Sequence, residues 1–306
     1  MLYSTKTAEQ KRIDLRQTLK QGGAQQFPGA FTPLTAKLIQ EKGFPGVYIS
    51  GGVLANELGL PDVGLTTLTE VAVRGGQIAR LTDLPCLIDA DTGFGEPMNV
   101  ARAIQELEDA GLAGCHIEDQ FNPKRCGHLD GKEVVPRDLM LRRITAAVRE
   151  RSDDAFVICA RTDAAGIEGI DSAIERAKAY ADAGADLIFT EALYSEADFE
   201  KFRAAVDVPL LANMTEFGKT ELIPAGRLEE IGYNAVIWPV TTFRTAMGQT
   251  EQMLREIAQT GTQDAWLDRM QHRSRLYELV RYDEYNQFDQ SVFTYSAENY
   301  RPTFEK

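Results

Sequence analysis

The sequence predicts an α/β protein, a (β/α)8 barrel of the TIM type with a C-terminal helical extension. Eight short apolar runs alternate with segments of helical period, which favours a parallel sheet. The eight units occupy roughly 250 residues, the usual size of such a barrel. Acidic and basic side chains recur where the apolar runs end. In such a barrel the active site lies at the carboxyl ends of the strands.

The predicted strands are short and mostly apolar. They span residues 27–31, 47–50, 86–89, 114–118, 156–161, 187–190, 209–213 and 235–238. Segments with the spacing of amphipathic helices lie between and after them, at 36–42, 69–81, 100–110, 137–149, 172–183, 196–205, 227–231 and 242–259. A doubly wound open sheet is the alternative fold. It more often has about six strands and a Gly-rich phosphate turn after the first, and the sequence has no such turn.

We expect three parts along the chain. Residues 1–25 form an N-terminal segment, residues 26–260 the catalytic barrel, and residues 261–306 a helical extension and tail. A barrel does not need this tail, so we expect it to contact a neighbouring subunit. Residues 265–281 have helical character, whereas residues 282–306 are polar and aromatic.

The composition excludes several classes of protein. With 33 Lys and Arg against 46 Asp and Glu, the 306-residue chain has a net charge of −13, which repels nucleic acids and anionic membranes. No apolar run is long enough to span a bilayer and no signal peptide is evident, so we expect a cytoplasmic protein. The four cysteines include no C-x-x-C pair, which argues against a structural zinc site.

Asp89-Ala90-Asp91 follows an apolar run and predicts a metal site. If the strand continued, alternation would send both carboxylates to one face, and paired carboxylates suit Mg²⁺ or Mn²⁺. Glu118 and Asp62 could join them through water. The alternative is that these acids cap the helix that follows.

Lys124-Arg125-Cys126-Gly127-His128 is the most informative segment. It places a thiol between two cations and an imidazole, where its pKa can be tuned for proton exchange near neutral pH. The other three cysteines lie in or beside apolar segments, where Cys is usually an inert hydrophobe. His116 and His128 flank this segment, although a lone His is more often structural.

Further polar groups at strand ends point to an anionic substrate. An Arg at position 161 ends an apolar strand and would be costly to bury without an anion. Its partner could be a barrel acid such as Glu191, or the substrate. Ser50-Gly51-Gly52 could present backbone N–H groups to an anion, whereas Tyr48 by pattern alone belongs to the core. The sequence contains neither a phosphate-binding P-loop nor a serine nucleophile elbow.

Five segments in this order resemble the isocitrate lyase/phosphoenolpyruvate mutase superfamily. They are Ser50-Gly51-Gly52, Asp89-Ala90-Asp91-x-Gly93-x-Gly95, His116-Ile117-Glu118-Asp119, Lys124-Arg125-Cys126-Gly127-His128 and Ala160-Arg161-Thr162-Asp163. The resemblance covers about residues 29–282. The Lys-Arg-Cys-Gly-His form resembles the methylisocitrate lyase branch, since isocitrate lyases usually read Lys-Lys-Cys-Gly-His and are much longer. The phosphonomutase branch lacks this Cys.

The resemblance implies a role for each matching residue. It implies Mg²⁺ on Asp89 and Asp91, with Asp62 and Glu118 reaching the ion through water. It implies catalytic roles for Cys126, Tyr48, His128, Arg161 and Glu118, and substrate contacts from Ser50, Gly51, Gly52, Gly127, Glu191, Asn213, Thr215, Arg244 and Arg273. Phe189, Ile237 and Pro239 match positions that accommodate an extra methyl group, although the family usually has Leu where this chain has Ile237.

The resemblance also implies an activity and an assembly. The expected reaction is cleavage of a C–C bond in 2-methylisocitrate, a tricarboxylate of the methylcitrate cycle in propionate catabolism, to pyruvate and succinate. The family fold swaps its last helix with a neighbour, usually in a homotetramer. The alternatives are isocitrate lyase or oxaloacetate hydrolase activity, phosphonomutase activity, and a non-catalytic barrel.

Overall fold

The computed structural model describes residues 4–125 and 131–293. Residues 4–250 form one compact unit, and the described residues from 251 onward form a second, so each is described by itself. Within the described residues, no helix is long and apolar enough to cross a bilayer.

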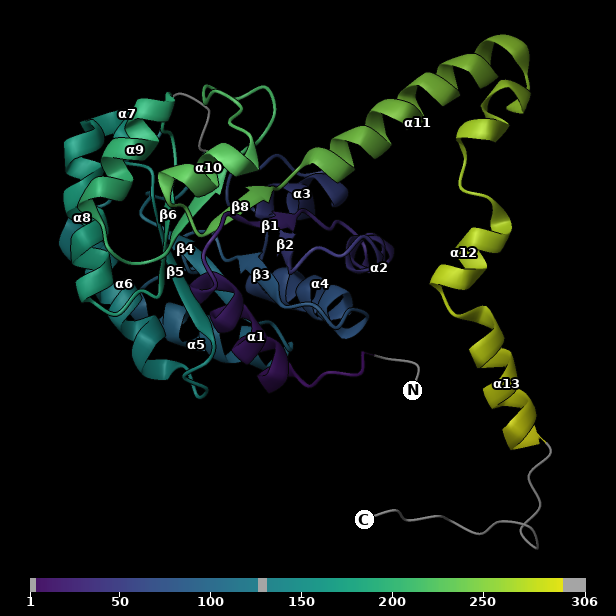
Figure 1. Ribbon diagram of the computed structural model, residues 1–306, viewed down its shortest axis with the longest axis horizontal. Coiled ribbons are helices and arrows are strands. Elements are labelled where there is room, and N and C mark those ends of the chain that lie inside the picture. Colours follow the sequence, from purple (N-terminus) through teal and green to yellow (C-terminus); the bar gives the residue numbers. More distant parts are fainter. Residues whose placement is uncertain (1–3, 126–130, 294–306) are drawn as a thin grey trace, which may run out of the picture. The chain divides into compact units, whose positions relative to one another are not determined.

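The first unit is an eight-stranded parallel barrel, as the sequence predicts (Figure 1). The strands are β1 (Gln25–Pro28), β2 (Val47–Ile49), β3 (Cys86–Asp89), β4 (Gly114–Glu118), β5 (Val157–Thr162), β6 (Leu187–Thr190), β7 (Leu210–Asn213) and β8 (Ala235–Trp238). Each pairs with the next, and β1 pairs with β8. A parallel bridge between Gly29 and Tyr48, with a 2.9 Å hydrogen bond from Ala30 N–H to the Tyr48 carbonyl, links β1 to β2 and nearly closes the barrel.

Helices precede and follow the strands along the chain, and most of them cover the outside of the sheet (Figure 1). They are α1 (Ala8–Lys20), α2 (Pro33–Glu41), α3 (Gly51–Glu57), α4 (Leu68–Arg80), α5 (Pro97–Asp109), α6 (Arg137–Glu150), α7 (Ala165–Glu168), α8 (Ile170–Asp182), α9 (Glu196–Ala205), α10 (Ala225–Ile231) and α11 (Thr241–Thr260). Eight of these match predicted helices to within a few residues. Helices α1, α3 and α7 have no counterpart among the predicted helices, and the predicted first strand, at 27–31, is shifted from β1.

Two layers of apolar side chains form the core. Outward-facing strand residues such as Ile88, Ile158 and Val236 pack under the surrounding helices. Inward-facing residues such as Leu87, Val157 and Leu211 fill the barrel, as expected for a strand whose side chains alternate between two faces. The barrel is therefore a packed core, and chemistry is confined to its carboxyl end.

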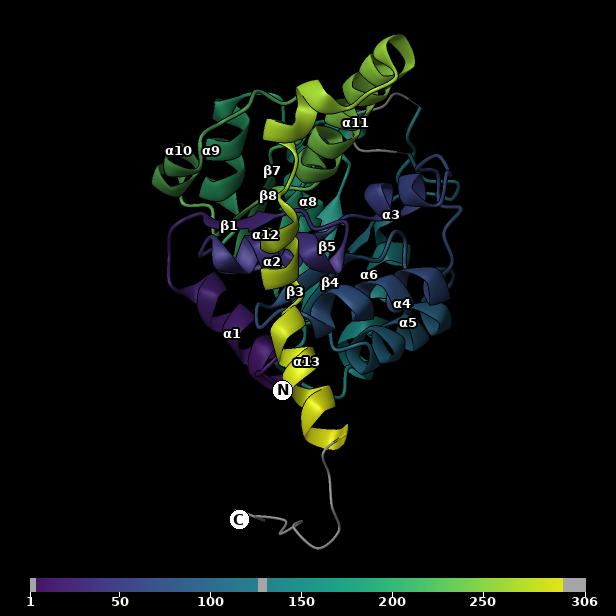
Figure 2. The ribbon, with the colours of Figure 1, turned by 90° about the vertical axis from the view of Figure 1, so that its right-hand side faces the viewer.

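Helix α1 closes the amino end of the barrel. A capping box at Thr7 and Gln10 starts the helix, and Leu15 and Leu19 pack into the cluster inside the barrel. Arg16 pairs with Asp186 at 2.9 Å. In Figures 1 and 2, α1 lies at the lower end of the barrel, opposite α3 and α10.

The second unit is helical and contains the last part of α11. A 3-10 helix, η1 (Asp264–Arg269), precedes α12 (Arg273–Leu279) and α13 (Tyr282–Phe293). The sequence analysis expected helical turns only as far as residue 281, but the structure continues as a helix through α13. Tyr277 and Tyr282 stack with ring centroids 4.8 Å apart across the short break between α12 and α13.

Candidate active site

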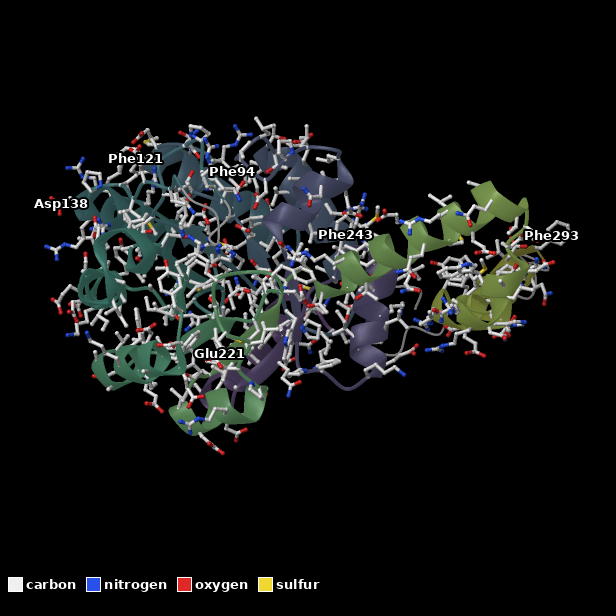
Figure 3. The ribbon with its side chains drawn as sticks, turned by 90° about the horizontal axis from the view of Figure 1, so that it is seen from above. Phe94, Phe121, Asp138, Glu221, Phe243 and Phe293 are labelled. Atoms are coloured by element: carbon white, nitrogen blue, oxygen red, sulfur yellow. The ribbon has the colours of Figure 1, made fainter. Side chains whose placement is uncertain are left out.

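The predicted polar residues gather at the carboxyl end of the barrel because the strand register sets them side by side. Asp89 lies opposite His116 between β3 and β4, and Glu118 lies opposite Arg161 between β4 and β5. These side chains and the loops that follow the strands surround the mouth of the barrel. Figure 3 views the molecule from this end.

A cleft of about 290 Å³ opens there. Its polar lining comes from Tyr48, Ser50, Gly52, Asn56, Asp62, Asp89, Lys124, Arg161, Glu191, Asn213, Thr215 and Arg244, and its apolar lining from Phe189, Ile237, Pro239 and Val240. A cleft of this size, with acids, cations and an apolar wall, fits a small polyanionic molecule with some hydrocarbon surface.

Asp89 is a buried carboxylate fixed by the backbone around it. Its two oxygens accept hydrogen bonds from the N–H groups of Gly51 at 3.1 Å and Asp91 at 2.9 Å. Burial opposes its ionisation, but His116 in its protonated form, Lys124 and Arg161 outweigh burial and lower the pKa of Asp89 to about 2. Asp89 is therefore a carboxylate at neutral pH. The resemblance assigns the Gly51 N–H to substrate, and in the structure this N–H donates to the Asp89 carboxylate.

Asp91 does not extend strand β3, and this corrects the alternation argued from the sequence. The strand ends at Asp89, and Asp91 has a left-handed backbone with φ of 47°. Asp91 Oδ1 lies 2.7 Å from the ammonium of Lys124, which also contacts Asp62. Burial, followed by the nearby charge of Asp89, raises the pKa of Asp91 to about 6. Two acids are held together here by a lysine between them.

Glu118 lies at the end of β4 and is completely buried. Neither of its carboxylate oxygens has a hydrogen-bond partner among the described residues, although Arg161 Nε lies 3.3 Å from Oε2. Burial raises the pKa of Glu118 well above its ordinary value, against the lowering effect of Arg161 and Lys124. A buried carboxyl without hydrogen bonds is unusual, and carboxylate oxygens are the ligands that a divalent ion prefers.

Arg161 is the central cation of the site. Its guanidinium makes a two-pronged ion pair with Asp163, at 2.9 and 3.1 Å, and lies 3.5 Å from Glu191. Lys132 contacts the same Asp163 at 3.0 Å, and the guanidinium stacks over the Phe189 ring at 5.0 Å. The sequence leaves two possible partners for Arg161, the barrel acid Glu191 and the substrate. Arg161 lies beside Glu191 and also lines the cleft, so its position suits both.

The cleft is also lined by a second arginine and an amide. Arg244, at the start of α11, contacts Thr215 at 3.4 Å and Glu216 at 3.0 Å. Asn213 donates to Glu191 at 3.1 Å, while its Oδ1 has no hydrogen-bond partner among the described residues. These groups leave polar atoms available to a ligand beside the apolar wall.

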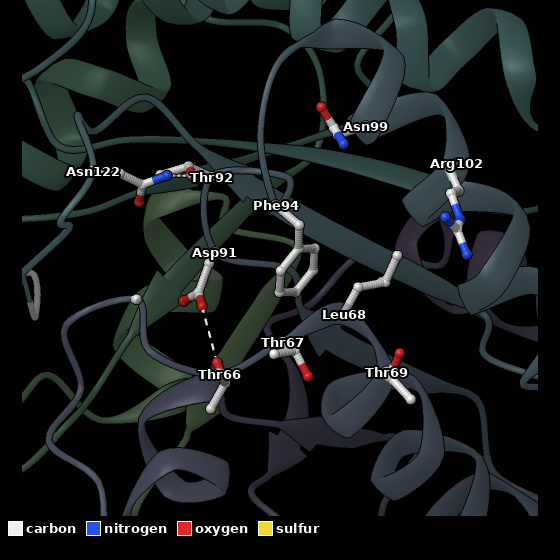
Figure 4. Close-up of a pocket in the computed structure, with 11 residues that line it drawn as sticks. Thr66, Thr67, Leu68, Thr69, Asp91, Thr92, Phe94, Asn99, Arg102 and Asn122 are labelled. Carbon is white, nitrogen blue, oxygen red and sulfur yellow. Dashed lines mark hydrogen bonds between the residues drawn. The ribbon is translucent and has the colours of Figure 1, made fainter.

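A second, larger cavity of about 440 Å³ adjoins the acids (Figure 4). Asp91 forms part of its wall and accepts a 3.3 Å hydrogen bond from Thr66. Asn122 donates to Thr92 at 2.9 Å on the same side, and Phe94 projects between Asp91 and Leu68. Residues of α4, of α5 and of nearby loops form this cavity together, so no single sequence pattern predicted it.

The structure brings most predicted residues together. Of the predicted set, Gly51 and Glu118 lie behind the cleft lining, and Asp91 lines the second cavity. Cys126, Gly127 and His128 lie outside the described residues. Arg273 begins α12 in the second unit. Three features of the site were not predicted: the lining residues Asn56 and Val240, and the contact of Lys124 with the acids. The only sequence signal for any of them was the motif that contains Lys124.

No three His, Cys, Asp or Glu side chains converge to hold a metal ion within residues 4–125 and 131–293. The acids are nevertheless arranged around a positive charge, that of Lys124.

Comparisons with known proteins agree with this fold. The family model described as phosphoenolpyruvate phosphomutase matches residues 15–258. A probable 2-methylisocitrate lyase of Corynebacterium glutamicum is 72% identical over 99% of both chains. A 2-methylisocitrate lyase of Aeropyrum pernix is 45% identical over 93% of this chain and 92% of its own.

Comparison with solved structures indicates the same fold. A 2,3-dimethylmalate lyase of the PEP mutase/isocitrate lyase superfamily has a TM-score of 0.85 and 31% identity, covering 94% of this chain and 96% of its own. A phosphonopyruvate hydrolase in complex with oxalate and Mg²⁺ has a TM-score of 0.82 and 26% identity, covering 95% and 99%.

The fold and the site thus define a barrel enzyme of the PEP mutase/isocitrate lyase superfamily, on the branch that cleaves carbon–carbon bonds. Within that superfamily, the chain belongs to the 2-methylisocitrate lyase family.

Proposed function

We propose that this enzyme cleaves 2-methylisocitrate to pyruvate and succinate by a retro-aldol reaction. The observation that carries the proposal is one cleft in which acids, two arginines and an apolar wall face each other. A tricarboxylate with one added methyl group needs all three. The identity of 72% to a probable 2-methylisocitrate lyase favours this substrate over isocitrate, oxaloacetate and phosphonates.

The residues present fit a divalent metal ion. The donors are carboxylate oxygens, which Mg²⁺ and Mn²⁺ prefer, and the buried oxygens of Glu118 have no hydrogen-bond partner among the described residues. We propose that Asp89 and Asp91 hold the ion, with Asp62 and Glu118 reaching it through water. The bound ion would supply Lewis-acid polarisation of substrate oxygens.

The chain's own residues would move the protons. Tyr48 takes the substrate hydroxyl proton as the C–C bond breaks, and the bonding electrons remain on the succinate part as an enolate. Arg161 and His128 stabilise that negative charge, a contribution worth about 3 kcal/mol for a well-placed donor. The Cys126 thiol then gives its proton to carbon, which completes succinate. Cys126 and His128 enter this scheme from the family resemblance alone.

The apolar wall would select the methyl group. Phe189, Ile237 and Pro239 line the cleft together, and Val240 joins them. A hydrophobic pocket discriminates one methyl group by about 10- to 200-fold in kcat/KM. We therefore expect a preference for 2-methylisocitrate over isocitrate within that range.

One assay tests this function. Pyruvate release from 2-methylisocitrate is compared with glyoxylate release from isocitrate and with oxaloacetate hydrolysis, each with and without EDTA. The proposal expects 2-methylisocitrate to be the best substrate, and it expects EDTA to abolish turnover until Mg²⁺ is added back. Faster cleavage of isocitrate, or turnover that survives chelation, would contradict it.

We also propose that the enzyme is a homotetramer in which the C-terminal helices are exchanged between subunits. Helix α11 carries the exposed apolar side chains Met247 and Leu254, which suit a partner surface. Light scattering of the full chain and of a chain ending at Gly261 tests this. Loss of the tetramer in the shorter chain is the expected result, and an unchanged tetramer would contradict the exchange.

A further inference from the structure

The acid cluster is balanced by a cation that belongs to the chain itself. The Lys124 side chain is 3% exposed, and its ammonium contacts Asp62 and lies 2.7 Å from Asp91 Oδ1. Lys124 is therefore a cation buried among acids, with Asp62 and Asp91 in direct contact.

The fold holds Lys124 in this place. On one side of it, Asn122 donates to Thr92 at 2.9 Å (Figure 4). On the other side, Arg125 N–H donates to Gln120 Oε1 at 2.8 Å, and Gln120 Nε2 donates to the Arg125 carbonyl at 2.9 Å. The chain on both sides of Lys124 is thus held by hydrogen bonds to loop residues that follow β3 and β4. The contact with the acids is a built feature, unlike a surface ion pair between two mobile side chains.

The ammonium contacts the same carboxylates to which we assign the divalent ion. Asp91 Oδ1 has no hydrogen-bond partner among the described residues and only Lys124 as its ion-pair partner there. A divalent ion on Asp91 would lie close to the ammonium, and two cations so close repel each other strongly in a buried site. A divalent ion on Asp91 Oδ1 therefore competes with Lys124 for that oxygen.

We propose that Lys124 is the resident counter-ion of the unloaded acid site, which a divalent ion displaces from Asp91. In this arrangement Lys124 sets the affinity of the site for divalent ions. The inference rests on the proposed metal site, and it assigns Lys124 a role in the unloaded protein, before substrate binds. The lysine stabilises acids that would otherwise repel one another, and its displacement weakens divalent binding.

Binding of Mn²⁺ to the full-length protein without substrate tests this directly. After chelator treatment, free Mn²⁺ is counted by electron paramagnetic resonance during a titration. Lys124→Met keeps the apolar stem and removes the charge, so we expect its Kd for Mn²⁺ to be at least tenfold lower than that of the wild type. Lys124→Arg keeps the charge and should stay within about threefold of the wild type.

A matched control is Lys132→Met. Lys132 is a second lysine with a buried side chain, 3.0 Å from Asp163, and Asp163 is not one of the proposed metal acids. Its replacement removes one positive charge from the same end of the barrel without freeing Asp62 or Asp91. We expect a change in Mn²⁺ affinity of less than threefold.

Thermal unfolding provides a second readout that does not depend on activity. Without metal, Lys124→Met should melt below the wild type, because its acids lack a counter-ion. With saturating Mn²⁺, its Tm should rise by more than that of the wild type. If Lys124→Met is insoluble, Lys124→Gln, which keeps a hydrogen-bond donor without the charge, decides the matter in the same two assays.

Two results would overturn the inference, and they differ. If Mn²⁺ binds the wild type but Lys124→Met binds it equally or more weakly, Lys124 supports the loaded site and the displacement model is wrong. If neither protein binds Mn²⁺, the proposed metal site itself fails, and the inference falls with it.

Discussion

The Tyr48 hydroxyl lies 2.8 Å from Nε2 of His116, and the two rings are nearly parallel inside the mouth of the barrel. Burial raises the pKa of Tyr48 well above its ordinary value, so the phenol keeps its proton at neutral pH. Burial also lowers the pKa of His116 to about 4, so the imidazole is neutral. A protonated phenol can accept a substrate proton only if it passes its own proton on, and His116 is placed to receive it.

Tyr48→Phe should therefore lower kcat by at least about 100-fold, the usual contribution of a positioned acid–base group. The ring and its packing are retained, so the Tm should change little. Steady-state pyruvate release provides the measurement. Tyr233→Phe is the matched control, because Tyr233 is equally buried and loses only a 3.2 Å contact with Thr190. A Tyr48→Phe enzyme within fivefold of the wild-type kcat would remove Tyr48 from proton transfer.

Asp163→Asn should misplace Arg161 without touching the cleft directly. Asp163 is completely buried and holds two nitrogens of Arg161 as well as Lys132. An Asn side chain offers one acceptor oxygen and no charge. We expect kcat/KM to fall about 10- to 100-fold. Removal of one partner from a buried ion pair typically costs about 3–5 kcal/mol, and the remaining acids near Arg161 favour the lower end.

The Asp163 result is checked by steady-state kinetics together with urea unfolding. Asp163→Glu restores the charge and should recover part of the lost stability, although its longer side chain does not restore the geometry. Kinetics equal to the wild type in Asp163→Asn would show that the ion pair does not position Arg161.

The thiols should differ sharply in reactivity. Cys86, Cys115 and Cys159 are buried, and burial raises the pKa of Cys86 to about 12 and the pKa values of the other two thiols in the same direction. Because the thiolate is the reactive form, these three should resist iodoacetamide at pH 8. We predict one equivalent of label per chain, on Cys126, with labelling of the other three only above pH 11 or after unfolding.

Mass spectrometry of the native protein measures this labelling. Cys126→Ser should take up no label at pH 8, and it should lose cleavage while Mn²⁺ still binds. Wild-type turnover in Cys126→Ser would refute its role as the proton donor. Labelling of Cys86 in the native protein at pH 8 would contradict the buried core described above.

The sequence predicts the barrel and most of the cleft for one physical reason. Apolar strand runs are visible in the chain, and parallel strands bring their carboxyl ends to one edge, so Asp89, Glu118 and Asn213 meet there. No knowledge of the loops is required for that conclusion.

Other features depend on tertiary contacts that no local pattern carries. Helix α1 is rich in Lys, Arg and Gln, and its role shows only when Leu15 and Leu19 meet the barrel interior. Ser50-Gly51-Gly52 suggests an anion-binding turn, yet Ser50 caps a helix that starts at Gly51. The contact of Lys124 with Asp62 joins residues 62 positions apart, and neither neighbourhood predicts it.

The closure of the barrel by α1 leads to the last prediction, on stability. Leu15 is 1% exposed and packs among side chains inside the barrel, whereas Ile13 on the same helix is 41% exposed. Leu15→Ala should lower the free energy of unfolding by about 2–4 kcal/mol, through lost apolar burial and the cavity left behind. Ile13→Ala should cost less than about 1 kcal/mol. Urea unfolding followed by far-ultraviolet circular dichroism measures both, and equal losses for the two variants would show that α1 does not seal the barrel.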